Sequence, residues 1–389
     1  MTRMGGAAIA GLGLTDVGKI YDRSATDLAA EAVRLAAADA GLAMSEVDGL
    51  LVTPGVRGAP RLSLQKVLGL TDLRLLAEIS ALGAGPAVMI AHAAAAIERG
   101  EATAVACVFA DTPLKPQGSG RDAFGGSGRS LPKGFAGYHA GIGAVTPNLF
   151  YALAARRHFE TYGTTSEQLG AIAVAQRAWA AYNPDAQHRA PLTLAEHQNS
   201  PLIADPLRLL DCCLVSNGAA AVIVTSAERA RDLAQPPVGV LGWGQAHPGR
   251  VMHHDSRFGL RTGAAEAGPR ALRMAGVTVD DIDLLQLYDC YTYTVLVTLE
   301  DYGFCPKGEG GTFVVDGRLA PGGSLPCNTG GGQLSAYYLT GFTPIVEAVI
   351  QGRGQAAARQ VARRDVIMVS GNGGILEHHA TLILNGAGR

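Results

Sequence analysis

The chain has 389 residues, of which 48% are hydrophobic and 17% are charged. This length and composition suffice to bury one large core or two adjoining cores, so we expect a folded protein rather than a disordered one. The 32 Lys and Arg residues nearly balance the 34 Asp and Glu residues, and the charges form no blocks. This pattern favours neither a nucleic-acid-binding protein nor one attached to a membrane surface.

The first ten residues carry one positive charge and lead into a strand-like run, without the pattern of an export signal. No stretch reaches the roughly 18 to 20 uninterrupted apolar residues of a membrane-spanning helix. The six cysteines show neither CxxC spacing nor the pattern of a disulfide framework. We therefore expect a cytoplasmic protein with reduced thiols and no structural zinc.

A repeated segment indicates that the chain was built by duplication. Residues 29–52 recur without a gap at 264–287, with Gly41 aligned to Gly276. Each copy predicts a helix that ends at its glycine, then an acidic turn and a buried strand. Pro269 interrupts the second copy, so we expect that helix to begin near Pro269. A unit used twice at this separation favours two duplicated α/β halves.

Strand-like and helix-like segments alternate through the rest of the chain. A strand predicted over 104–109 follows an alanine-rich helix, and another predicted over 366–369 precedes a glycine-rich turn. Such alternation favours mostly parallel sheets covered by helices. Residues 113–147 are rich in Gly, Pro and Ser and predict a long loop over the site.

The change from one half to the other is expected at residues 226–240, where two prolines precede a new strand. This division gives an N-terminal half over residues 1–230, which includes a loop region over 113–200. The C-terminal half then covers residues 231–389.

Four ordered motifs carry the family signal. They are residues 205–226, in which Asn217 stands where an Asp is usual, and residues 287–291, 303–311 and 328–335. Together they resemble the thiolase superfamily, and in particular its lipid-transfer or sterol-carrier-type branch. The resemblance covers nearly the whole chain. It implies the thiolase fold, in which two duplicated α/β halves with helix-covered mixed sheets form five layers, α-β-α-β-α.

The resemblance also shows what is missing. In thiolases a cysteine at the start of a buried helix is acylated, and counting back from Ile97 places Gly83 at that position. The nearest cysteine along the chain is Cys107, so a small shift of the alignment restores no nucleophile. The resemblance assigns the backbone at Gly83, and at Gly373 and Gly374 of the C-terminal glycine turn, to stabilising an oxyanion.

Two tyrosines stand at the other catalytic positions of the family. Tyr338 replaces a usual His, and Tyr288 replaces a usual His or Asn. This combination resembles the thiolase-fold aldolases of steroid side-chain degradation, which cleave a β-hydroxyacyl-CoA into a shorter acyl-CoA and a ketone or aldehyde. Asp289, Tyr337 and Asn328 are expected near the pocket, although an extended backbone would turn Asp289 away from Tyr288.

A retro-aldol cleavage needs a base for the β-hydroxyl proton, a stabilised thioester oxygen and an acid for the enolate, but no covalent nucleophile. We assign Tyr338 to the β-hydroxyl and Tyr288 to the enolate or thioester oxygen, with the exchange of these roles left open. The expected small product is acetyl-CoA or propionyl-CoA. The substrate itself carries coenzyme A, and no other cofactor is implied.

Two alternatives remain beside this hypothesis. One is a thiolase or acyltransferase that uses an unexpected cysteine, and the other is a catalytically silent thiolase-fold subunit that binds acyl-CoA. The resemblance also implies a homodimer and a small acyl-CoA-binding partner with an OB-fold and a zinc ribbon.

Charged and histidine side chains offer weaker signals. Four loop cations could contact CoA phosphates: Lys115, Arg121, Arg129 and Lys133. Solvated charges are the more usual interpretation of such residues. The pairs His253–His254 and His378–His379 are poor candidates for a metal site, because adjacent side chains point in different directions. We therefore predict no metal.

Overall fold

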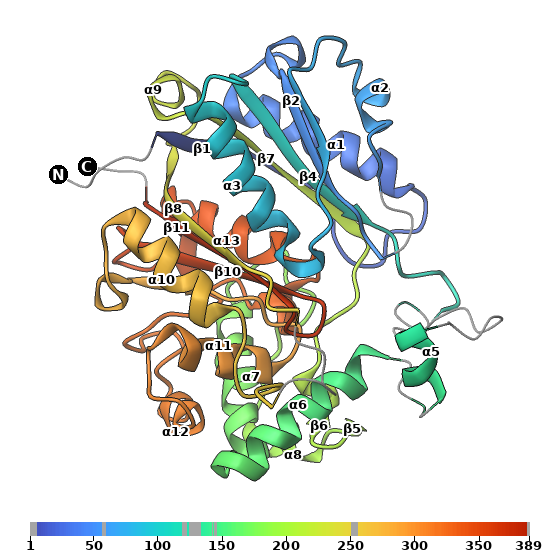
Figure 1. Ribbon diagram of the computed structural model, residues 1–389, viewed down its shortest axis with the longest axis vertical. Coiled ribbons are helices and arrows are strands. Elements are labelled where there is room, and N and C mark those ends of the chain that lie inside the picture. The colour runs from blue at the N-terminus through green and yellow to red at the C-terminus, as the bar shows by residue number, and fades with distance from the viewer. Residues whose placement is uncertain are drawn as a thin grey trace.

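The computed structural model describes residues 6–56, 60–118, 123, 134–141, 143, 146–249 and 256–386. In these residues one nine-stranded mixed sheet has the order β3-β2-β4-β7-β1-β8-β11-β10-β9, and β5 and β6 form a small separate pair (Figure 1). The strands are β1 (Ala7–Leu14), β2 (Gly49–Thr53), β3 (Leu75–Glu78), β4 (Ala104–Asp111), β5 (Leu202–Ala204), β6 (Leu207–Arg208), β7 (Gly218–Ser226), β8 (Val238–Ala246), β9 (Leu284–Gln286), β10 (Ile367–Gly373) and β11 (His378–Leu384).

The helices connect and cover these strands. They are α1 (Ala25–Ala40), α2 (Leu64–Leu68), α3 (Gly85–Glu98), α5 (Gly134–Gly141), α6 (Pro147–Tyr162), α7 (Ser166–Ala180), α8 (Leu194–Asn199), α9 (Ala227–Ala230), α10 (Ala264–Ala275), α11 (Thr292–Tyr302), α12 (Gly310–Val314) and α13 (Phe342–Gly352). No helix in these described ranges is long and apolar enough to cross a membrane.

The strand order repeats about a central junction. The first set is β3-β2-β4-β7-β1 and the second is β8-β11-β10-β9. In chain order β1 begins the first set and β8 begins the second, and these two strands meet at the junction. Each lies beside the strand that ends its own set in the chain, β7 or β11. β1 and β8 pair antiparallel there over three residue pairs. In the second set, Leu285 of β9 forms a parallel bridge with Cys327. The segment at Cys327 therefore takes the place beside β9 that β3 takes beside β2 in the first set. One sheet runs through the junction without a break, so the sheet marks no boundary between the halves. The division at residue 230 therefore stays a prediction.

The duplicated segments fold alike, as predicted. α1 and α10 both end at a left-handed glycine, Gly41 (φ 76°) and Gly276 (φ 71°). A Cβ on Gly13 of β1 would overlap the carbonyl oxygen of Ala32, and one on Gly244 of β8 would overlap that of Ala267, the repeat equivalent of Ala32. Glycine therefore lets each helix approach its strand closely in both halves.

The expected start of the second copy's helix was wrong. α10 begins at Ala264, and Pro269 lies inside it. The first turn forms because Thr262 Oγ1 accepts the N–H of Ala264 at 3.1 Å and the carbonyl of Gly263 accepts the N–H of Ala267 at 2.9 Å. Pro269 removes only its own N–H from the hydrogen bonding of the helix. The packing of α10 on β8 and β11 stabilises the helix on both sides of this proline.

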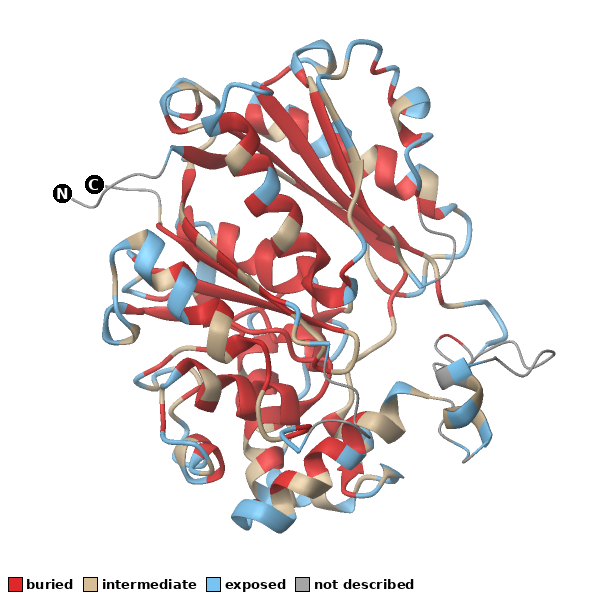
Figure 2. Ribbon diagram, in the orientation of Figure 1, coloured by how far each residue is buried: buried red, intermediate tan, exposed pale blue. Residues whose placement is uncertain are grey.

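The layers follow the expected five-layer order. α1 packs on β1, β4 and β7, while α10 packs on β8 and β11 on the far side of the molecule. Between the two sets lie α3, which contacts β4, β7, β10 and β11, and α13, which contacts β1, β9 and β10. Figure 2 shows these central helices and the strands beside them as mostly buried.

The predicted loop region is largely helical where it is described. α6, α7 and α8 lie within residues 113–200, and α5 lies within 113–147. α7 forms because Thr165 and Gln168 make a capping box and Leu169 and Ile172 are fully buried. The interpretation of this whole region as loop was therefore wrong, and helix α7 packs against α11 and α12 of the second half.

Candidate functional site

The two predicted tyrosines meet in space. Tyr288 lies two residues beyond β9, and Tyr338 follows a short π-helical turn, Gly332–Ala336. Their hydroxyl oxygens are 3.2 Å apart, although the residues are 50 positions apart in the chain. Tyr288 is 4% exposed and Tyr338 is half-buried. This hydrogen-bonded pair is the centre of the candidate site.

Side chains from other elements hold the backbone around Tyr288. Its N–H donates to Ser370 Oγ of β10 at 3.0 Å, and its carbonyl accepts from Thr294 Oγ1 of α11 at 3.1 Å. The preceding N–H, of Leu287, donates to Asn328 Oδ1 at 2.7 Å. Asn328, predicted near the pocket, therefore anchors the end of β9.

Tyr338 is held from the N-terminal half. Its N–H donates to Ser216 Oγ at 3.0 Å, and Gln187 Nε2 donates to the same oxygen at 2.8 Å. The N–H of Leu339 donates to Thr343 Oγ1 at 2.9 Å. The two tyrosines are thus fixed by separate frameworks that converge at their hydroxyl groups.

Asp289 joins these two frameworks. Its carboxylate is fully buried and accepts the N–H of Gln333 at 2.8 and 3.0 Å and the N–H of Leu334 at 3.2 Å. Those N–H groups belong to the π-helical turn that leads to Tyr338, while Asp289 directly follows Tyr288. Burial raises the pKa of Asp289 to about 7, although the backbone N–H donors act in the opposite direction.

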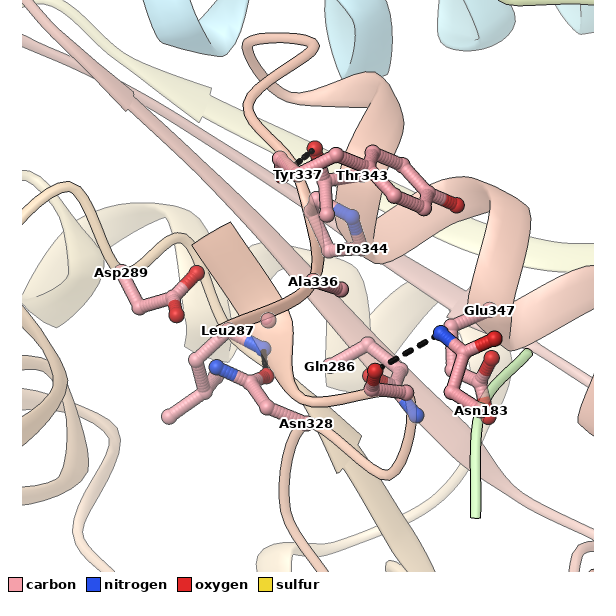
Figure 3. A pocket seen from close by; sticks show the side chains of 12 residues that line it. Asn183, Gln286, Leu287, Asp289, Asn328, Ala336, Tyr337, Thr343, Pro344 and Glu347 are labelled. Carbon is pink, nitrogen blue, oxygen red and sulfur yellow. Dashed lines mark hydrogen bonds between the residues drawn. The ribbon is translucent and has the colours of Figure 1, made fainter. Parts of the chain in front are cut away.

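A pocket lies beside the backbone that carries the tyrosines (Figure 3). The predicted residues Asp289, Tyr337 and Asn328 line it, but Tyr288 and Tyr338 do not. Figure 3 shows Asp289 and Asn328 on one side of this pocket and Glu347 on the other. The pocket is thus separate from the hydroxyl pair.

Gly83 lies directly against Tyr288. A Cβ at Gly83 would overlap the backbone oxygen of Asn372 and would lie 2.5 Å from Cε2 of the Tyr288 ring. A Cβ on Gly373 would lie 2.8 Å from the nitrogen of Gly83. Gly374 follows with φ 65°. The structure therefore brings Gly83, the glycine turn and Tyr288 together, and the phenol ring fills the space that a side chain at position 83 would need.

Burial sets the protonation of the pair. It raises the pKa of both tyrosines above the usual value near 10, so both are neutral phenols at neutral pH. Their mutual hydrogen bond acts in opposite directions, because it lowers the pKa of Tyr338 and raises that of Tyr288. The hydrogen bond does not by itself distinguish the two tyrosines, because either hydroxyl can be its donor.

Comparison with known proteins places the chain in a family. The family model described as "Thiolase C-terminal domain-like" matches residues 244–386. A "Steroid side-chain-cleaving aldolase" of Thermomonospora curvata is 39% identical over 380 residues, which cover 95% of this chain and 96% of that protein. The chain belongs to the thiolase superfamily, in its sterol-carrier-type branch.

Two further relatives of this thiolase-superfamily protein match nearly end to end. A "17-hydroxy-3-oxo-4-pregnene-20-carboxyl-CoA lyase" of Mycobacterium tuberculosis is 37% identical over 378 residues, covering 95% of this chain and 97% of the relative. A solved structure of an "Ltp2-ChsH2(DUF35) aldolase" has a TM-score of 0.88 and 35% identity, and the match covers 99% of both chains. The predicted fold and branch are thereby confirmed.

The cysteines of this thiolase-superfamily chain are poor nucleophiles. All six are free thiols. Cys290, beside Tyr288, and Cys305 both have pKa values that burial raises to about 12. Burial also raises the pKa of Cys213 well above its usual range. Because the thiolate is the reactive form, these environments disfavour a relocated thiolase nucleophile.

Helix α6 supplies site residues that the sequence analysis missed. The ring of Tyr151 lies 4.5 Å from that of Tyr291, and Asn148 Oδ1 accepts the Tyr291 hydroxyl at 2.5 Å. Tyr151 belongs to the same buried cluster as Tyr288 and Tyr291, and Tyr338 packs against that cluster. No family motif covers this helix. The helical spacing of its buried residues is the signal that would have found it.

Among the remaining candidates, the structure describes only Lys115 and the pair His378–His379. Lys115 is exposed, while Arg121, Arg129, Lys133, His253 and His254 lie outside the described residues. His378 Nδ1 is 3.2 Å from His247 Nδ1, whereas the fully buried His379 contacts the Tyr302 hydroxyl at 2.8 Å through Nε2. The adjacent histidines point to different surroundings, as the sequence predicted.

Proposed function

We propose that this chain is a carbon–carbon lyase that cleaves a β-hydroxyacyl-CoA, such as a steroid side-chain CoA ester, by a retro-aldol reaction. The observation that carries this proposal is the hydroxyl pair of Tyr288 and Tyr338, 3.2 Å apart, beside a Gly83 that cannot hold a nucleophile. The names of the two relatives, an aldolase and a lyase acting on a steroid carboxyl-CoA, support the same chemistry.

The reaction balances without a covalent intermediate. A base takes the β-hydroxyl proton, the bond between Cα and Cβ breaks, and the β-carbon becomes a ketone or aldehyde. The electron pair passes to the thioester as an enolate, which takes a proton at Cα to give acetyl-CoA or propionyl-CoA. Coenzyme A is carried by the substrate, and no redox step requires another cofactor.

The hydrogen bond between the tyrosines brings their two hydroxyls to one point, and either hydroxyl can be its donor. We therefore keep the assignment made from the sequence, in which Tyr338 takes the β-hydroxyl proton, with the exchange of the two roles left open. Tyr288 donates to the enolate or thioester oxygen, with the Gly83 backbone and the turn at Gly373–Gly374 beside it. The thiolase alternative loses support because burial raises the thiol pKa values.

Replacing either phenol tests the proposal. Tyr288→Phe and Tyr338→Phe should each lower kcat at least about 100-fold, the scale of lost acid–base catalysis. The matched control is Tyr337→Phe, because Tyr337 is buried and lines the separate pocket, so its variant should keep near-normal turnover. The measurement is release of acetyl-CoA or propionyl-CoA from a panel of β-hydroxyacyl-CoAs. Near-normal turnover in both phenol variants contradicts the proposal, and release from no substrate favours a silent acyl-CoA-binding subunit.

We further propose that the chain forms a homodimer in the cytoplasm and acts with a small acyl-CoA-binding partner that has an OB-fold and a zinc ribbon. The similar solved structure, whose name joins an aldolase to a DUF35 protein, supports such a complex. Release of acetyl-CoA or propionyl-CoA is therefore measured with and without a DUF35 protein. Sedimentation of the purified chain, alone and with that protein, measures both assemblies.

A further inference from the structure

Left-handed backbone conformations gather around the candidate site. Among the described residues, six that are not glycine have positive φ, and five of them lie in segments that form the site: Leu82 (50°), Asn328 (51°), Thr340 (49°), Ile375 (57°) and Leu376 (70°). This conformation is unfavourable for L-residues because Cβ crowds the following carbonyl oxygen. Such strain persists where the surrounding structure imposes it, and it is concentrated at functional sites.

Leu82 differs from the others in being both apolar and exposed. Asn328 is held by its hydrogen bond to Leu287, and Leu376 is buried. Leu82 is 53% exposed, while Ala81 and Gly83 on either side of it are buried. Packing within the chain therefore accounts for Leu376 but not for the side chain of Leu82.

The position of Leu82 links it to the reacting groups. It opens the short 3-10 turn Leu82–Ala84 that leads into α3, and the next residue, Gly83, lies against the Tyr288 ring. On its other side, a Cβ added to Gly373 of the glycine turn would lie 2.8 Å from Cβ of Leu82. Leu82 therefore stands at the edge of the site, between the start of α3 and the glycine turn.

We propose that Leu82 contacts the apolar acyl group of the thioester and sets the preference for acyl size, an inference that rests on the proposed lyase function. The strained turn presents an apolar side chain to solvent beside polar hydroxyl groups. An acyl-CoA held by its oxygens at Tyr288 and the glycine turn would cover that side chain. Removing apolar surface from water on both sides favours a bulky acyl group over a short one.

A pair of substrates tests the contact. Leu82→Ala should lower kcat/KM about tenfold or more for a ring-bearing β-hydroxyacyl-CoA, and less than about threefold for a short-chain one, because the lost contact scales with buried apolar area. The matched control is Leu35→Ala on α1, where the leucine is 41% exposed and the helix packs on β1, β4 and β7, whereas Tyr288 follows β9. Equal effects on both substrates, or no effect on either, overturn the proposal.

A second measurement needs no turnover. A Leu82→Cys variant places an exposed thiol against a low background, because burial raises the pKa of the native thiols. Iodoacetamide should modify it, and the ring-bearing β-hydroxyacyl-CoA should slow that modification at least about threefold. Modification at the same rate with and without the thioester overturns the contact. Protection without any cleavage supports the contact while contradicting the lyase function, so the two failures are distinguishable.

Discussion

At the scale of the residue, the site depends on how two phenols share one hydrogen bond. Burial raises both pKa values, so neither tyrosine is a base by default. Either hydroxyl can be the donor of this bond, so the bond alone does not decide which tyrosine is the base. Two adjacent hydroxyls still allow one tyrosine, as phenolate, to accept a proton while the other donates one, which suits a reaction that needs both.

The first prediction concerns pH. If Tyr338 acts as phenolate and its pKa lies above 10, the active fraction is small at neutral pH and grows as protons are removed. We expect kcat/KM to rise about tenfold per pH unit from pH 7 to 9. The pH profile of wild-type cleavage measures this, with the protein's thermal unfolding followed over the same range as a control. A profile that falls across this range would contradict a tyrosine phenolate as the base, whichever tyrosine carries that role.

A second prediction concerns Gly83. An alanine there would overlap the backbone oxygen of Asn372 and press on the Tyr288 ring. Gly83→Ala should lower kcat/KM at least about tenfold and destabilise the fold by about 1–3 kcal/mol, the usual cost of overpacking. Gly141→Ala is the matched control, since a Cβ there meets nothing within 4 Å. Activity assays and urea unfolding of both variants measure the two effects; an unchanged Gly83→Ala protein contradicts the packing.

At the scale of the element, Asp289 connects the end of β9 to the π-helical turn that precedes Tyr338. Its carboxylate reaches two successive N–H groups of that turn, so this buried acid contributes to the separation of the tyrosines. The cost of burying its charge appears as a pKa raised to about 7. This residue acts on the reaction through the positions of others.

A third prediction follows from that pKa. A carboxyl group with a pKa raised above its unfolded value near 3.9 stabilises the fold fully at low pH, and that stabilisation is lost as pH rises to about 7. Asp289→Asn cannot titrate, so wild type should lose stability relative to this variant between about pH 4 and 7, by on the order of 1 kcal/mol per pH unit. Urea unfolding at several pH values measures the difference; parallel stability curves would mean an unshifted pKa.

At the scale of the whole molecule, duplication gives both halves the same close contact of helix and strand. Gly13 and Gly244 admit the carbonyl oxygens of Ala32 and Ala267, which are equivalent in the repeat. The central helices α3 and α13 then contact both sets of strands. Tyr288 and Tyr338 come from the second half, while Gly83 and Ser216 come from the first, so the site requires the halves to be packed together.

A fourth prediction tests this equivalence. Gly13→Ala and Gly244→Ala should each lower the free energy of unfolding by about 1–3 kcal/mol, because each added methyl group meets a backbone oxygen that cannot move aside freely. Urea unfolding of each variant measures the loss, again with Gly141→Ala as the control. A loss confined to one of the two glycines would contradict equivalent packing in the halves.

The sequence by itself determined the duplication, the family, the absence of a nucleophilic cysteine near Gly83 and the identity of the two tyrosines. These follow from spacing and motif order, which are properties of the linear chain. The start of α10 was predicted wrongly, because contacts with β8 and β11 outweigh the local signal of Pro269.

Only the tertiary structure decided the hydrogen bond between Tyr288 and Tyr338, the part played by α6 and the exposure of Leu82 on a strained turn. Each depends on which distant segments meet. Periodicity records which face of an element is buried, but it carries no information on what that face touches. The two phenols could therefore be identified from the chain, whereas the contact between their hydroxyls required the tertiary structure.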